Sequence, residues 1–130
     1  MALFYKKVQR GNPSKPEAPK LWYPLLKSIG LVRDRQVAKL LAEETTLNPK
    51  EAEMALYQLL KVVMRLLLDG HTVQLGELGT FCVVIEGEGS VKEEEVNATK
   101  IKKTKIRFIA SEETRNELKH ASFKDAATMQ

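Results

Sequence analysis

The sequence predicts a mixed α+β fold. Three observations point to it: a long capped helix at residues 49–68, a hairpin of two short strands directly after it, and a strand at residues 101–109 whose alternate side chains are basic. Helical and strand periodicities therefore follow one another in a chain of 130 residues, a length typical of one domain.

The helix at residues 49–68 has signals at both ends. Asn48 is a good N-cap, Pro49 suits the first helical position, and Glu51 can accept a hydrogen bond from the Asn48 N–H. Asp69-Gly70 supplies the residue type that closes a helix. Apolar side chains cover roughly half of its circumference, more than a small monomer easily buries, so we expect a homodimer. We expect the dimer interface to include Leu56, Leu59, Leu60, Val63, Leu67 and Phe81.

The first 32 residues form an N-terminal extension before this helical region. Residues 3–10 predict a strand, and residues 11–20 predict a connector because they hold three of the five prolines. Residues 21–29 predict an edge strand or a packed loop, since Pro24 has no amide hydrogen to donate.

The rest of the chain alternates between helical and strand patterns. A helix is expected from Asp34 to about residue 45, and strands at residues 71–75 and 80–85. Residues 86–97 are rich in glutamate and predict a mobile excursion or an irregular hairpin. Ser111 is expected to cap a short helix. Residues 122–130 are expected to be a flexible C-terminal tail.

Composition excludes several function classes. The net charge is +4, and no run of eighteen apolar residues or signal-peptide pattern occurs, so we expect a cytoplasmic protein with no membrane contact. His71 and His120 have no ligands at metal spacing, and the single Cys82 suits a buried thiol. No catalytic motif occurs, so we expect no enzyme activity, cofactor or small-molecule substrate.

The strand at residues 101–109 has two different faces. Lys103, Lys105 and Arg107 alternate with apolar or neutral residues, which places these cations on one side about 7 Å apart. This spacing is comparable with the phosphate repeat of one DNA strand, although a solvated strand face is the alternative interpretation. Lys100 and Lys102 are candidate supporting contacts.

A second basic cluster occurs near the N-terminus. Lys6, Lys7 and Arg10 could follow a phosphate backbone, and the alternative is again a solvated segment. Phosphate contacts of either cluster would be largely independent of base sequence and sensitive to salt.

The order of these elements resembles the HU and integration host factor family of bacterial histone-like proteins. The resemblance covers residues 33–121 and is most specific at residues 69–81, DGHTVQLGELGTF. It implies an intertwined dimer with a helical base, a β-sheet saddle and two β-arms that wrap and bend DNA. The basic strand would lie on the saddle.

The chain departs from the family pattern in its arm. The corresponding residues 86–97 are acidic and lack the proline that inserts between base steps, so insertion would need Val91 or Val96. The extension begins with a strand and a QRGNP connector, as in a longer, divergent branch of the family. The resemblance implies a nucleoid-associated homodimer that binds and bends or condenses double-stranded DNA. The alternative is an HU-like dimer that has lost DNA wrapping and serves as a protein-interaction or structural module.

Overall fold

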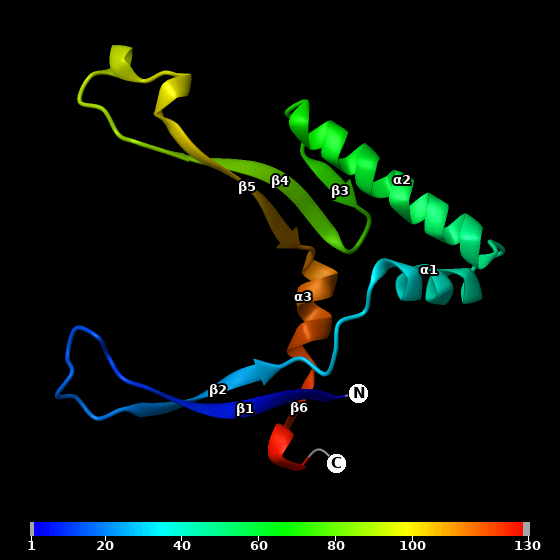
Figure 1. The fold of residues 1–130 in the computed structure, drawn as a ribbon, viewed down its shortest axis with the longest axis horizontal. Coiled ribbons are helices and arrows are strands. Elements are labelled where there is room, and N and C mark those ends of the chain that lie inside the picture. The colour runs from blue at the N-terminus through cyan, green and yellow to red at the C-terminus, as the bar shows by residue number, and fades with distance from the viewer. Residues whose placement is uncertain (1, 129–130) are drawn as a thin grey trace. The chain divides into compact units, whose positions relative to one another are not determined.

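The computed structural model describes residues 2–128, and these form two compact units (Figure 1). The terminal unit combines residues 2–33 with residues 117–128, and the central unit is Asp34–Asn116. Both ends of the chain therefore contribute to the same unit.

The central unit begins with two helices, α1 (Asp34–Glu43) and α2 (Pro49–Leu68). The expected capping box of α2 is present: the Glu51 N–H donates to Asn48 Oδ1 over 2.9 Å, and the Asn48 N–H donates to Glu51 Oε1 over 3.4 Å. Gly70 follows α2 with a φ of 90°, a left-handed conformation that favours glycine. The bounds predicted for α2 are confirmed, whereas α1 ends two residues earlier than expected.

Small side chains let α1 and α2 approach one another. Ala38 of α1 and Ala52 of α2 are almost completely buried, and Arg35 and Glu53 join the two helices through an ion pair of 3.5 Å. The end of α2 contributes the third buried residue, Leu67. Among residues 2–128 the only other buried residue is Gly79, so the core of a single chain is very small.

A three-stranded antiparallel sheet follows, with the order β3-β4-β5 (Figure 1). Its strands are β3 (Val73–Leu75), β4 (Gly79–Gly87) and β5 (Ile101–Ala110). The predicted division of faces is confirmed, because Phe81 is paired with Phe108 on the apolar side and their ring centroids lie 4.9 Å apart.

Gly79 permits the close approach of β4 and β5. Its φ is 153°, and a Cβ at this position would lie 2.4 Å from the carbonyl oxygen of Ile109 and 2.6 Å from the Phe108 ring. A larger residue would therefore strain the backbone and separate the strands.

The acidic excursion forms the loop between β4 and β5. It contains two single-turn 3₁₀ helices, η1 (Glu93–Glu95) and η2 (Ala98–Lys100), and the register shifts between Glu86 and Gly87. Helix α3 (Glu112–Lys119) comes after β5. The Thr114 N–H donates to the Ser111 hydroxyl oxygen over 3.1 Å, which confirms the predicted cap.

The terminal unit is a second three-stranded sheet, with the order β2-β1-β6. Strands β1 (Ala2–Arg10) and β2 (Leu21–Lys27) form an antiparallel hairpin, and β2 is an edge strand. Strand β6 (Ser122–Asp125) runs parallel to β1 and is followed by η3 (Ala126–Thr128). The region expected to be a flexible tail thus contributes a strand, and its last two residues lie outside the described part of the chain.

Candidate nucleic-acid interface

The basic face of β5 consists of Lys103, Lys105 and Arg107. In the β4–β5 register these residues lie opposite Glu86, Val84 and Cys82, and cross-strand partners point to the same side of a sheet. All three cations are exposed. The structure therefore places the three predicted cations together on one accessible side.

An acidic side chain shares this face. Lys105 Nζ lies 2.7 Å from Glu86 Oε1, and both side chains are about half exposed. Glu86 therefore reduces the positive potential next to Lys103 and Lys105. Alternation along β4 could have revealed this residue, because Glu86 continues the side marked by Cys82 and Val84.

The two candidate supporting cations do not join the basic face. Lys102 belongs to the opposite side of β5, and its Nζ lies 3.6 Å from Glu88 Oε1. Lys100 is half-buried in η2, where its carbonyl oxygen accepts a hydrogen bond from the Glu88 N–H over 3.0 Å. Within the described chain, the basic face consequently contains three of these five cations.

The N-terminal cluster is divided between two faces of the terminal sheet. Lys6 and Arg10 share one side of β1, whereas Lys7 lies on the other side with its Nζ 3.4 Å from Asp125 Oδ2. The Ala127 N–H donates to Asp125 Oδ1 over 3.0 Å, and this bond, aided by Lys7, lowers the pKa of Asp125. Lys7 thus contributes to an ion pair that links β1 to β6.

Charge is distributed unevenly between the two units. The sequence of the terminal unit, residues 1–33 and 117–130, has nine Lys and Arg against three Asp and Glu, a net charge of +6. The central unit has 12 against 14, a net charge of −2. The net positive charge of the chain is therefore that of the terminal unit, although the central unit has more basic residues.

The residues expected at a dimer interface differ in exposure. Leu59 and Leu60 of α2 are 41% and 54% exposed, whereas Leu56, Val63 and Phe81 are half-buried. The sixth residue, Leu67, is only 3% exposed in a single chain and has little surface left for a partner.

Residues 2–128 lack two features, a metal-holding cluster and a membrane-spanning helix. They contain no group of three or more His, Cys, Asp or Glu side chains placed to hold a metal ion. Within the same residues, no helix combines the length and apolar character needed to cross a bilayer.

Comparisons with known proteins agree with the predicted resemblance. The model of the HU-HIG family, described as an HU domain fused to wHTH, Ig, or Glycine-rich motif, matches residues 1–125. No curated protein matches the chain. A solved structure from Bacteroides vulgatus, described as a candidate bacterial DNA-binding protein, is similar with a TM-score of 0.62 and 12% identity.

The similarity to this solved structure concerns the fold. It covers 94% of this chain and 47% of the other, so the chain spans about half the length of that neighbour. The family match, in contrast, extends over nearly the whole chain and includes strands of both units. The chain belongs to the HU-HIG family of HU-domain proteins.

Proposed function

We propose that this protein binds double-stranded DNA as a homodimer, through the basic face of β5. The observation that carries the proposal is the exposure of Lys103, Lys105 and Arg107 on one side of the sheet. Cations at this spacing can neutralise successive phosphates without reading base edges. Membership of the HU-HIG family supports the same function.

The surface of the single chain supports the dimer. Two separate folded units of 47 and 83 residues would together expose roughly 8,300 Å², from the size scaling of compact proteins. The chain exposes 11484 Å². The difference of about 3,000 Å² per chain corresponds to about 6,000 Å² over two chains, at the upper end of what obligate dimers bury, and exposed Leu59 and Leu60 lie on the helix expected at the interface.

DNA bending is a further part of the proposal. Proteins of this kind kink DNA by inserting an apolar side chain between base steps. Val91 is fully exposed in the loop between β4 and β5, and Val96 is 60% exposed. Either valine could act as the inserted residue. A Val91→Ser/Val96→Ser variant is expected to bind with similar affinity but bend DNA less, measured by energy transfer between labelled duplex ends.

The DNA-binding proposal can be tested with the triple variant Lys103→Ala/Lys105→Ala/Arg107→Ala. Fluorescence anisotropy of a labelled duplex would be followed over a salt series. Each lost phosphate contact should reduce the slope of log affinity against log salt by about 0.9. The matched control replaces three exposed helix lysines, Lys39, Lys50 and Lys61, and removes the same charge. Equal losses in both variants would contradict a specific role for the basic face.

A second candidate function follows from the acids near the basic face. The central unit has a net charge of −2, and Glu86 already forms an ion pair with Lys105. These observations favour an HU-like dimer that has lost DNA wrapping and acts as a protein-interaction module. Unchanged duplex affinity in the triple variant, together with intact dimer mass, would support this candidate instead.

A further inference from the structure

We propose that the terminal unit contains a separate site for single-stranded DNA, in which cations of one sheet face bind phosphates and Tyr23 stacks on a base. We call this surface the terminal cationic face and define it by Lys6, Arg10, Lys27 and Lys124. It lies in a different unit from the basic face of β5 and does not depend on the function proposed above.

The strand register brings the four cations to one side of the sheet. Strand β1 lies between β2 and β6, and Phe4, Lys6 and Arg10 are on the same side of it. Phe4 is paired with Lys27 on one neighbour and with Lys124 on the other. Partners in register share a face, so Lys27 and Lys124 flank Phe4 across the sheet, and Lys6 and Arg10 follow on the same side along β1.

No acid offsets these cations on their own face. The described strand residues on this side are apolar, polar or basic, and none of the four cations has an ion pair in the described chain. All four are exposed. Lys27 and Lys124, on strands either side of β1, are roughly 10 Å apart, and Lys6 and Arg10 are roughly 13 Å apart along β1. These separations suit phosphates of a single flexible backbone.

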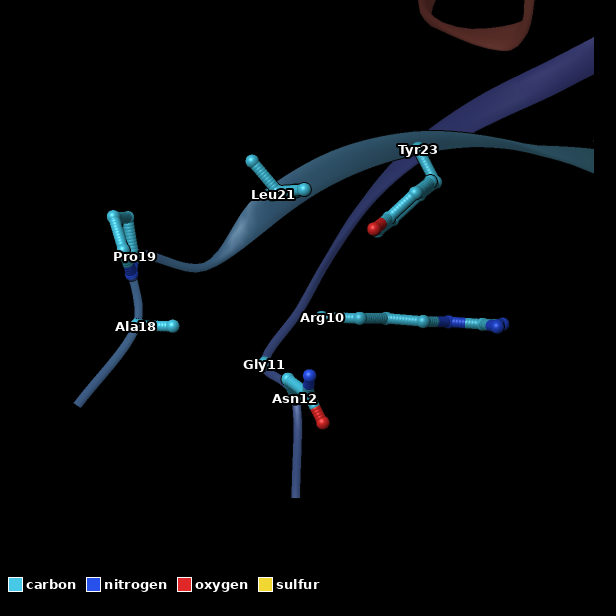
Figure 2. Close-up of a pocket in the computed structure, with 7 residues that line it drawn as sticks. All are labelled: Arg10, Gly11, Asn12, Ala18, Pro19, Leu21 and Tyr23. Carbon is cyan, nitrogen blue, oxygen red and sulfur yellow. The ribbon is translucent and has the colours of Figure 1, made fainter. Parts of the chain in front are cut away.

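A pocket lies at the end of the β1–β2 hairpin, beside Arg10. It has a volume of about 460 Å³ and is lined by Arg10, Tyr23 and the connector. In Figure 2 the Tyr23 side chain extends toward the side of the hairpin where the Arg10 side chain lies, and Asn12 follows at the start of the connector. The pocket thus combines an aromatic ring with a guanidinium group.

Hydrogen bonds give this connector a defined conformation. Asn12 Oδ1 accepts from the Ser14 N–H over 3.0 Å, and the carbonyl oxygen of Asn12 accepts from the Lys15 N–H over 3.0 Å. The Ala18 N–H then donates to the carbonyl oxygen of Lys15 over 3.0 Å. The connector that lines the pocket is therefore held by consecutive turns, which lowers the conformational entropy lost on binding.

The apolar side chains distinguish a single strand from a duplex. Leu21, Tyr23 and Leu25 lie opposite Arg10, Val8 and Lys6, so an apolar column runs beside the cations. Tyr23 is 44% exposed. A duplex presents phosphates but keeps its base faces stacked, whereas a single strand presents both phosphates and free base faces. The combination of ring and cations therefore suits a single strand.

The first test uses neighbouring lysines that point to opposite faces. Binding of a labelled oligothymidine would be measured over a salt series for Lys6→Ala/Arg10→Ala and for the matched control Lys7→Ala/Lys119→Ala. Each phosphate contact to a single strand contributes about 0.7 to the salt slope, so the first variant should lose about 1.4 and the control close to none. Equal slopes in the two variants would overturn the proposal.

The second test examines stacking. Tyr23→Leu should weaken oligothymidine binding by roughly 5- to 100-fold, because it removes the ring, whereas Tyr23→Phe should bind like the wild type. Thermal melting of each variant checks that the sheet remains folded. Equal affinity of Tyr23→Leu and Tyr23→Phe, with both folded, would exclude a stacking role.

Two further probes identify the class of partner. Poly-glutamate of matched length should compete weakly, and competition as strong as that of oligothymidine would overturn the proposal in favour of an acidic protein. Duplex binding by Lys6→Ala/Arg10→Ala should remain close to that of the wild type. The triple variant of β5 should retain oligothymidine binding while losing duplex binding, so failure of either proposal can be recognised separately.

Discussion

The two units of this chain differ in how they are built and in the charge they carry. The central unit is continuous in sequence and contains all four buried residues found among residues 2–128, Ala38, Ala52, Leu67 and Gly79. The terminal unit joins both chain ends, has no fully buried residue in its described part, and has a net charge of +6. The unit with the HU-like hairpin thus supplies the packed core, while the other unit carries the net positive charge.

This difference bears on how binding could be divided within the chain. A fold-based assignment alone would place every DNA contact in the central unit, whose net charge is −2. The basic face of β5 still supports a DNA contact in the central unit, because it is exposed despite the surrounding acids. The charge of the terminal unit indicates that it too can attract a polyanion.

The largest expected effect concerns the dimer. Leu60→Asp should produce a protein of the monomer mass, 14.7 kDa, whereas the proposed dimer predicts twice that mass for the wild type. A carboxylate in an apolar interface has no partner to compensate its lost hydration, which costs several kcal/mol. Light scattering after size exclusion measures the mass. Gln58→Asp adds the same charge at an exposed polar position of α2 and should leave the dimer intact.

A wild-type chain that is monomeric at micromolar concentration would contradict the dimer. Retention of the dimer by Leu60→Asp would move the interface elsewhere on the surface. Either result would change the comparison, because the small core of the central unit would then have to be stable without a partner.

The next effect compares one glycine from each unit. Gly79→Ala should destabilise the central unit by roughly 2–4 kcal/mol, because the added Cβ would meet the Ile109 carbonyl oxygen and the φ of 153° is unfavourable for alanine. Gly11→Ala should be nearly neutral, since its Cβ would make an ordinary contact of 3.5 Å with the Lys20 side chain. Urea unfolding of both variants measures the difference.

Equal stability of these two variants would show that β4 and β5 can separate at little cost. The hairpin would then not be the rigid part of the central unit.

A smaller effect is expected from the acid on the basic face. Glu86→Gln should raise duplex affinity up to about fivefold at low salt, because it releases Lys105 from an exposed ion pair. Glu88→Gln releases Lys102 on the opposite side of β5 and should change affinity less. Anisotropy titrations compare the two. A larger gain for Glu88→Gln would place the DNA on the other face of the sheet.

The smallest effect is a pH dependence of the terminal unit. The Ala127 N–H and Lys7 lower the pKa of Asp125 in the folded chain, so the stability this carboxylate contributes is fully present above its unfolded pKa, near 3.9. That contribution is lost as the pH falls below about 4. The protection factors of the β6 amides, which compare the observed exchange with the intrinsic exchange at the same pH, should therefore fall at low pH. Asp125→Asn should have lower protection factors in β6 at neutral pH, and these should change less on acidification.

The elements with local signals could be predicted from the sequence. Asn48, Pro49 and Glu51 specify the start of α2 by a capping box, and the structure begins the helix at that point. Alternation specified the two faces of β5, because one side carries Lys103, Lys105 and Arg107. Both signals act over a few residues and depend little on distant parts of the chain.

The missed features depend on contacts between distant residues. Strand β6 has only four residues and pairs in parallel with β1, more than a hundred positions earlier, so no local pattern marks it. The ion pair of Lys7 with Asp125 depends on that pairing. The separation of Lys6 from Lys7, in contrast, follows from strand alternation and could have been predicted once residues 3–10 were assigned to a strand.

The most direct test of the account is the salt dependence of duplex binding by the wild-type protein and by the β5 triple variant. Three cations in each of two protomers can engage up to six phosphates, so the wild-type slope of log affinity against log salt should lie between about −3 and −5. The triple variant should lose most of that slope. A wild-type slope near zero, or the same slope in the variant, would contradict DNA binding through the basic face of β5.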